Sequence, residues 1–206
     1  YEKLRYYDEY VKSGEYVKSP CFTHFDKVFN ELSGKTWGIA GLGSIGRRVA
    51  DVAKAFGCRV VYFSASGHTY DTEFKRVSFD ELLENSDIIS IHAPLNDKTN
   101  NLFDDAAFAK MKKNAVLLNL GRGPIVNNAA LTKALKENII AGAGLDVIDK
   151  EPIAADNPLL EIQDSSKLII TPHIAWATYE ARVRLMDEVY ENIKAFEAGE
   201  SRNAVV

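Results

Sequence analysis

Three glycines mark the part of the sequence with the clearest chemical use. Gly41, Gly43 and Gly46 form a Gly-x-Gly-x-x-Gly motif directly after the short apolar run at 36–40. In such a motif the first glycine permits a tight turn, the second lets the backbone approach a pyrophosphate, and the third lets a helix pack close to the strand. The N–H groups that begin the helix then face the phosphates. The motif predicts a dinucleotide site, although a glycine turn alone also occurs in loops that bind nothing.

Such a motif needs a strand before it and a helix after it, and the flanking residues fit both. Apolar residues recur at helical spacing in 44–56, and further short apolar runs alternate with helical patterns along the chain. We expect strands at 36–40, 59–63, 75–77, 87–92, 115–119, 143–147 and 168–170, and helices at 1–13, 44–56, 78–84, 104–111, 128–137 and 178–198. This alternation predicts an α/β fold, a doubly wound parallel sheet of the Rossmann type, with a helical N-terminal arm and a long C-terminal helix.

Ligands of an open parallel sheet bind outside the carboxyl ends of its strands. The residues that follow the predicted strands are 41–45, Ser64, 92–94, 121–123, Asp146, Glu151 and 171–173. We therefore expect one arginine, Arg122, one glutamate, Glu151, and one histidine, His173, to converge on the same edge.

Five stretches, in this order, resemble the D-isomer-specific 2-hydroxyacid dehydrogenases. They are Gly-Leu-Gly-Ser-Ile-Gly at 41–46, Asn-Leu-Gly-Arg-Gly at 119–123, Gly-Ala-Gly-Leu-Asp-Val at 142–147, Glu-Pro at 151–152 and Thr-Pro-His-Ile-Ala at 171–175. The resemblance covers about residues 30–200, which in that family form the cofactor domain. It implies hydride transfer between the nicotinamide C4 and C2 of a small 2-keto or D-2-hydroxy acid, with glycerate, hydroxypyruvate and glyoxylate chemistry as the family's commonest use.

The resemblance also implies that Arg122, Glu151 and His173 are the catalytic set. Arg122 offers a planar fork of donors for a substrate carboxylate or keto oxygen. His173 would protonate the forming alkoxide during reduction and take the proton back during oxidation, and a neighbouring Glu151 would favour the imidazolium. Each residue has a structural alternative: a surface turn for Arg122, a turn cap for Glu151 and a hydrogen-bonded structural histidine for His173.

NAD is the cofactor that the resemblance implies. Asp146 would face the nicotinamide carboxamide or serve a structural role, and His92 would contact the cofactor or fill space beside the adenine ribose. The residues expected at the cofactor are Gly41, Gly43, Ser44, Ile45, Gly46, Ser64, His92, Ala93, Thr99, Leu120, Gly121, Arg122, Asp146, His173 and Ala175. We predict no metal site.

One position departs from the dinucleotide pattern. The pattern expects Asp or Glu at the end of the second strand, about 20 residues after the glycines, to bind the ribose hydroxyls. This sequence has Ser64 there, followed by Ala65, Ser66 and Gly67. Loss of the carboxylate removes the repulsion of a 2′-phosphate, but no Arg or Lys stands beside Ser64 in the sequence to attract one. NAD is therefore expected, and NADP stays an alternative.

Two other functions remain open. A cofactor-sensing interaction protein, like the family's corepressor relatives, would keep the dinucleotide fold but would need no proton donor such as His173. A formate dehydrogenase-like enzyme would pair its catalytic histidine with an amide, whereas this sequence has Glu151. The sequence does not decide which 2-hydroxy acid is used.

Composition narrows the class of protein and partner. The chain has 206 residues, is 46% hydrophobic and carries a net charge of −4 without a long Lys/Arg cluster, so a small molecule is favoured over nucleic acid. No apolar run approaches the roughly 18 residues of a membrane span. Two cysteines without metal spacing, Cys21 and Cys58, indicate reduced thiols. We expect a cytoplasmic protein without a membrane partner.

The N-terminal region indicates a larger assembly. We divide the chain into a helix and arm at 1–35, a cofactor domain at 36–177, and a helix and tail at 178–206. The arm is rich in aromatic residues without periodicity, which predicts contact with its own domain or with a second subunit of a homodimer. Because Tyr1 is not Met and lies inside a predicted helix, we expect these residues to be the cofactor-binding portion of an enzyme whose N-terminal substrate domain is absent here.

Overall fold

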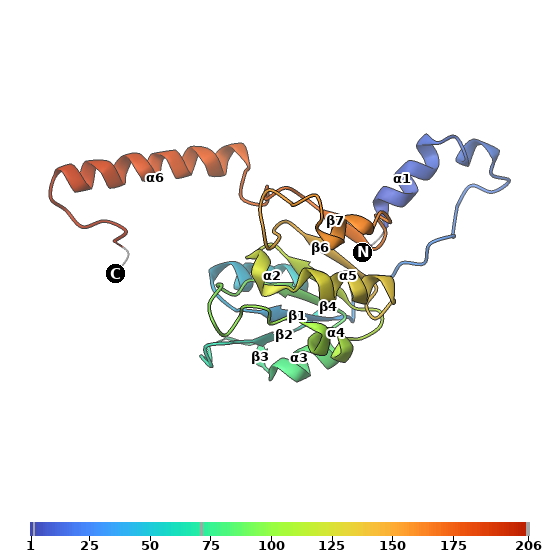
Figure 1. The fold of residues 1–206 in the computed structure, drawn as a ribbon, viewed down its shortest axis with the longest axis horizontal. Coiled ribbons are helices and arrows are strands. Elements are labelled where there is room, and N and C mark those ends of the chain that lie inside the picture. Colours follow the sequence, from blue (N-terminus) through green and yellow to red (C-terminus); the bar gives the residue numbers. More distant parts are fainter. Residues whose placement is uncertain (2, 71, 205–206) are drawn as a thin grey trace. The chain divides into compact units, whose positions relative to one another are not determined.

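The protein is described here by a computed structural model, which covers residues 1, 3–70 and 72–204. Within these residues seven strands form one sheet in the order β3-β2-β1-β4-β5-β6-β7 (Figure 1). The strands are β1 (Thr36–Ala40), β2 (Arg59–Phe63), β3 (Lys75–Arg76), β4 (Ile88–Ile91), β5 (Val116–Asn119), β6 (Gly142–Leu145) and β7 (Leu168–Ile170). Every neighbouring pair is parallel. The strand order reverses between β1 and β4, so the predicted doubly wound sheet is confirmed.

Helices connect the strands at the predicted places, with ends that shift by only a few residues. They are α1 (Leu4–Lys12), α2 (Ser44–Ala55), α3 (Phe79–Asn85), α4 (Asp105–Lys110), α5 (Asn128–Lys136) and α6 (Tyr179–Glu197), with 3-10 turns at Tyr16–Lys18, Gly123–Ile125 and Pro158–Glu161. Side chains fix several helix starts. Ser78 and Glu81 form a capping box at the start of α3, with hydrogen bonds of 3.1 and 2.8 Å, and Asp104 caps α4. No helix of the described residues combines the length and apolar character needed to cross a bilayer.

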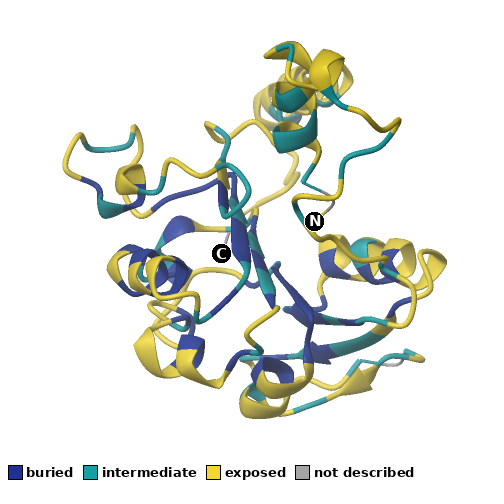
Figure 2. Cartoon of the chain, turned by 90° about the vertical axis from the view of Figure 1, so that its right-hand side faces the viewer, coloured by how far each residue is buried: buried dark blue, intermediate teal, exposed yellow. Residues whose placement is uncertain are grey.

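Helices cover both faces of the sheet. Leu83, Phe108 and Leu131 on α3, α4 and α5 contribute to the larger core, whereas α2 packs over Ile39 and Tyr62 in the smaller one. Neighbouring side chains of a strand point to opposite faces. The two cores therefore lie on opposite sides of the sheet, because Ile39 of β1 belongs to the smaller core and the adjacent Ala40 belongs to the larger one. Figure 2 shows the buried residues gathered in the strands and on the inner sides of the helices.

Contacts divide the chain into two compact units, residues 1–171 and 172–206. The first unit contains the sheet and α1. No residue of the helix α1 is buried. The second contains α6, on which Leu185, Met186, Tyr190 and Phe196 are exposed. The domain limits expected from the sequence, at residues 35 and 177, stay a prediction.

Candidate functional site

The glycine turn between β1 and α2 has the form that a pyrophosphate site requires. A Cβ built on Gly41, whose φ is +101°, would lie 2.6 Å from the Ala93 nitrogen, and one built on Gly46 would lie 2.2 Å from the Gly41 carbonyl oxygen. A Cβ on Gly43 would meet no atom within 4 Å. The first and third glycines are therefore needed by the packing, whereas Gly43 keeps the outer side of the turn open. Gly43 is also the N-cap of α2 and provides no side-chain cap, so the first N–H groups of this helix suit an anion.

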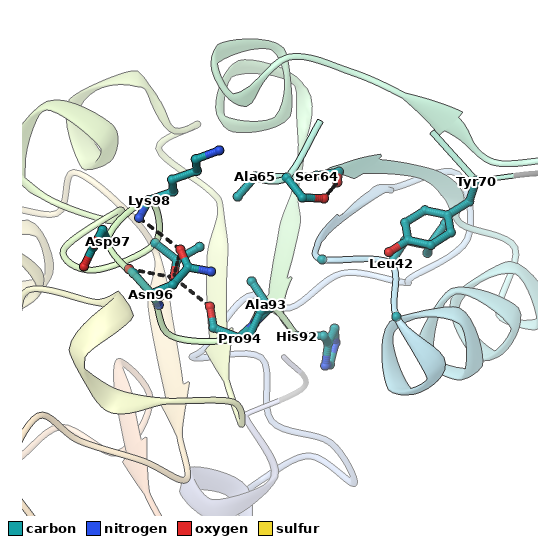
Figure 3. A pocket seen from close by; sticks show the side chains of 14 residues that line it. Leu42, Ser64, Ala65, Tyr70, His92, Ala93, Pro94, Asn96, Asp97 and Lys98 are labelled. Carbon is teal, nitrogen blue, oxygen red and sulfur yellow. Dashed lines mark hydrogen bonds between the residues drawn. The ribbon is translucent and has the colours of Figure 1, made fainter. Parts of the chain in front are cut away.

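A cavity of about 430 Å³ lies beside this turn (Figure 3). It joins the carboxyl ends of β1, β2 and β4 and brings together six of the residues predicted at the cofactor: Gly41, Gly43, Ser64, His92, Ala93 and Thr99. The shape and the glycine cradle fit the phosphates and the adenosine end of a dinucleotide. Ser44 and Ile45 begin α2 with exposed side chains, outside the cavity lining.

Thr99 shapes the wall of the cavity through bonds within its own loop. Its hydroxyl donates to the Pro94 carbonyl at 2.6 Å and accepts from the Asn96 N–H at 2.9 Å, and the residue is fully buried. The hydroxyl thus fixes the loop that follows β4. This arrangement makes Thr99 a positioning residue for the cofactor pocket.

His92 is positioned by a contact with Ser90, a buried residue of β4. Its Nε2 lies 3.0 Å from the Ser90 hydroxyl, which also accepts a hydrogen bond of 2.9 Å from the Trp37 indole N–H. Because Trp37 can only donate, the Ser90 proton is free to be given to His92 Nε2, which favours a neutral ring protonated on Nδ1. Burial also lowers the pKa of His92. A neutral His92 therefore lines the cavity.

A second set of candidates lies at the ends of β5 and β6. Buried Asn119 ends β5 and holds both ends of the following turn: its amide donates to the Arg122 carbonyl at 3.0 Å, and its side-chain oxygen accepts from the Gly121 N–H at 3.1 Å. Arg122 is exposed and donates to the Gly121 carbonyl at 2.8 Å. Leu120 is 48% exposed. Asn119 thus presents Arg122 at the strand end, as the sequence predicts.

The Arg122 turn meets the loop that carries Glu151. A Cβ on Gly123 would lie 1.8 Å from the Ile148 carbonyl oxygen, so only glycine allows this approach. Ile148 in turn donates its N–H to Glu151 Oε1 at 3.1 Å. The Glu151–Pro152 peptide is cis. Two of the three predicted catalytic residues are therefore carried by segments in direct contact.

Asp146 follows β6 and is anchored to the end of β7. Its Oδ1 accepts a hydrogen bond of 2.5 Å from the Thr171 hydroxyl, and the residue is only 4% exposed. His173 and Ala175 belong to the second unit. His173 has a φ of 54°, in the left-handed region that a non-glycine residue seldom adopts without support from its surroundings. The predicted convergence of His173 with Arg122 and Glu151 stays a prediction.

Comparison with known proteins identifies the family. The model for the D-isomer specific 2-hydroxyacid dehydrogenase, NAD binding domain, matches residues 1–175. The chain belongs to the D-isomer specific 2-hydroxyacid dehydrogenase family. The resemblance inferred from the sequence is therefore confirmed.

Individual members of the family are similar over nearly the whole chain. A glycerate dehydrogenase of Methylorubrum extorquens is 38% identical over 97% of this chain, and a glyoxylate reductase of Aeropyrum pernix is 41% identical over 93%. The solved structure of an acyclic imino acid reductase in complex with NADPH and D-Arg superposes on all of this chain, with a TM-score of 0.86 and 33% identity, and is covered to 63%. The chain spans only 62% and 58% of the two curated relatives.

Six further described residues line the cavity outside the strand-end segments that the sequence indicates. They are Ala65, Ser66, Tyr70, Asn96, Asp97 and Lys98. All but Tyr70 lie within three positions of a predicted residue, where a strand-end segment continues into its loop. Tyr70 lies six positions beyond Ser64 in an irregular loop, where no periodicity indicates which side chains face inward.

Proposed function

We propose that this chain is the cofactor-binding portion of an NAD(P)-dependent oxidoreductase that interconverts small 2-keto acids and D-2-hydroxy acids. The observation that carries the proposal is the contact between the Arg122 turn and the Glu151 loop at Gly123, beside a glycine turn open to a dinucleotide. Membership of a dehydrogenase family supports the same reaction. The relatives named as a glycerate dehydrogenase and a glyoxylate reductase favour substrates of two or three carbons.

Arg122 binds the acid in this proposal. Its guanidinium is exposed at the strand end, and its backbone is fixed by both polar atoms of the Asn119 amide. A guanidinium can give two parallel hydrogen bonds to a carboxylate, or one to the keto oxygen, with a geometry that an ammonium lacks. Arg122 would thereby orient C2 and stabilise the negative charge that develops on its oxygen.

His173 moves the proton. In the direction of reduction the imidazolium donates its proton to the oxygen on C2, and in the direction of oxidation the neutral ring accepts the hydroxyl proton. The nicotinamide supplies or takes the hydride when the cofactor is bound. A Glu151 carboxylate next to the ring would fix the ring orientation. The left-handed backbone at His173 supports a functional role, because such conformations concentrate at active sites.

The first part of the assembly proposal concerns a second copy of the chain. A groove of about 570 Å³ lies between the N-terminal segment and the sheet face formed by β5, β6 and β7, where Val116 and Leu118 are half-buried and Ile169 is exposed. The arm exposes Phe22 and Phe25 at 88% and 82%. So much exposed apolar surface is typical of an interface. We propose a homodimer through this domain, and sedimentation at the monomer mass of 22.9 kDa at micromolar concentration would refute it.

The second part concerns the substrate domain. We propose that this chain binds dinucleotide but needs a further domain to close over the substrate, because charge-assisted hydrogen bonds weaken in open water. A version extended at the N-terminus by about 100 to 120 residues, one ordinary domain, is expected to reduce glyoxylate or hydroxypyruvate with a kcat/KM orders of magnitude higher. Equal activity of the two chains would remove the two-domain proposal. The free cysteines, Cys21 and Cys58, support a cytoplasmic location.

A panel of keto acids tests the reaction. The extended enzyme should oxidise NADH or NADPH when given glyoxylate, hydroxypyruvate or pyruvate, and should show no such oxidation with the matching alcohols that lack a keto group. Failure to oxidise either cofactor with any keto acid would refute the proposed reaction. Dinucleotide binding without turnover, together with cofactor-dependent capture of a protein partner, would support the corepressor-like alternative instead.

A further inference from the structure

The loop that follows β2 is flanked by two arginines that are distant from it in the sequence. Arg47 lies on the first turn of α2, and Arg76 lies on the edge strand β3. Between them runs the loop 64–70, four of whose residues line the cavity. Neither arginine forms an ion pair with a carboxylate among the described residues, so their charges are available to a ligand.

Arg47 stands at the border between the phosphate turn and this loop. Its guanidinium carbon lies 4.7 Å from the centre of the Tyr70 ring, and its Nε donates to the Leu42 carbonyl at 3.5 Å. Leu42 and Tyr70 both line the cavity. A guanidinium stacked on a ring keeps its donors in the plane and its orientation fixed. Arg47 is therefore held against two residues that line the cavity.

Arg76 supports the other side of the loop. Its Nη1 donates to the Thr69 hydroxyl at 2.9 Å, and its Nη2 would lie 3.8 Å from a Cβ built on Gly67. The guanidinium thus lies against the backbone of the loop and brings a second positive charge to it.

The inner end of the loop offers hydroxyls instead of a carboxylate. The Ser64 and Ser66 hydroxyl oxygens are 3.1 Å apart, and both residues line the cavity. One hydroxyl donates to the other, which leaves one proton free for a ligand acceptor. Among the described lining residues Asp97 is the one carboxylate, and Figure 3 shows it on the side of the cavity opposite Tyr70. The residues 64–70 themselves include no carboxylate.

We propose that the loop 64–70 binds the 2′-phosphate of NADP(H), with the free hydroxyl proton of the Ser64–Ser66 pair as hydrogen-bond donor and Arg47 and Arg76 as counter-charges. The chain then prefers NADP(H) over NAD(H). This inference rests on the proposed dinucleotide site and names the cofactor that the site selects. The sequence alone favours NAD because the two arginines stand 17 positions before and 12 positions after Ser64.

Titration of the 206-residue chain with NADPH and with NADH tests this preference. We expect a Kd for NADPH about tenfold or more below that for NADH at low salt, and a smaller difference at high salt, since ion screening weakens the arginine–phosphate attraction. Adenosine 2′,5′-bisphosphate should compete with NADPH better than 5′-AMP does. This comparison tests binding of the adenosine end in the absence of the nicotinamide.

Three variants assign the preference to residues. Arg47→Gln and Arg76→Gln should each raise the Kd for NADPH several-fold and leave that for NADH within about twofold. Ser64→Asp should reverse the preference, because the carboxylate repels the 2′-phosphate and accepts hydrogen bonds from the ribose hydroxyls. Arg48→Gln is the matched control: Arg48 is the next residue on the same helix and is exposed, and its side chain makes no hydrogen bond or ring contact with described residues.

The outcomes separate this inference from the proposed function. Equal affinity for NADPH and NADH, or equal losses for both in the arginine variants, would overturn the inference and leave the dehydrogenase proposal intact. Preferential NADPH binding by an extended enzyme that reduces no keto acid would sustain the inference and refute the proposed reaction. Binding of neither cofactor would overturn both.

Discussion

Gly123 lies so close to Ile148 that a Cβ built on the glycine would stand 1.8 Å from the Ile148 carbonyl oxygen. This contact joins the segment that presents Arg122 to the loop that carries Glu151. Substitution Gly123→Ala must push the two segments apart. Overpacking of this kind costs about 1–3 kcal/mol of unfolding free energy. In the extended enzyme the displacement of Arg122 should lower kcat by about 10²-fold, the usual effect of a misplacement near 1 Å.

Chemical denaturation and keto-acid turnover of Gly123→Ala check this prediction. Gly121→Ala is the stability control, since its Cβ would lie 3.3 Å from the nearest atom, the Ile91 carbonyl oxygen, which requires only a small adjustment. An alanine at 123 with wild-type stability and turnover would show that the contact does not fix the site.

The glycines of the phosphate turn should separate binding from folding. Gly43 has φ −76°, a conformation open to any residue, and faces free space. Gly43→Ala should therefore leave stability unchanged but weaken dinucleotide binding at least about tenfold, because the methyl group occupies the path of the pyrophosphate.

Gly46→Ala should show the opposite pattern. Its Cβ would lie 2.2 Å from the Gly41 carbonyl oxygen, so the substitution should lower the unfolding free energy by about 1–3 kcal/mol. Thermal unfolding and nucleotide titration of both variants provide the comparison. If Gly43→Ala bound NAD(P)H as tightly as the wild type, the pyrophosphate would not lie on this turn.

His92 should contribute to the pH dependence of stability. Burial lowers the pKa of His92 in the folded protein, whereas in the unfolded chain it lies near the reference value of about 6.5. The unfolded state therefore binds a proton first as the pH falls below about 6.5, and the free energy of unfolding declines until the folded pKa is passed. The stabilising contribution is present above the unfolded pKa and is lost on acidification.

Replacement by an uncharged residue isolates this contribution. His92→Gln should lose less unfolding free energy than the wild type between about pH 7.5 and pH 5.5, and the difference between the two proteins gives the contribution of His92. Urea denaturation at several pH values measures it. Parallel pH profiles for the two proteins would show that His92 titrates as it does in the unfolded chain.

The fold could be predicted because its signals are local. Short buried strands are nearly all apolar, helices start at capping residues such as Ser78, and the glycine turn fixes the connection between β1 and α2. Parallel strands bring their carboxyl ends to one edge, so the residues after each strand could be chosen from the sequence. The cavity joins Gly41, Ser64 and His92 as this rule predicts.

The parts that could not be predicted depend on contacts between distant segments. The stacking of Arg47 on Tyr70 joins residues 23 positions apart, and the approach of Gly123 to Ile148 joins residues 25 positions apart. No periodicity or spacing records such pairs. Ser64 therefore appears in the sequence without a nearby cation, although the structure places arginines on both sides of its loop.

The most direct test of the account is the turnover of a 2-keto acid by the extended enzyme with and without His173. His173→Ala should lower kcat by about 10²–10⁴-fold, the usual contribution of general acid–base catalysis, and leave the Kd for NAD(P)H nearly unchanged. Arg122→Ala should likewise lower turnover steeply without loss of cofactor affinity. Activity of either variant within a few-fold of the wild type would contradict the assignment of the catalytic residues and with it the proposed mechanism.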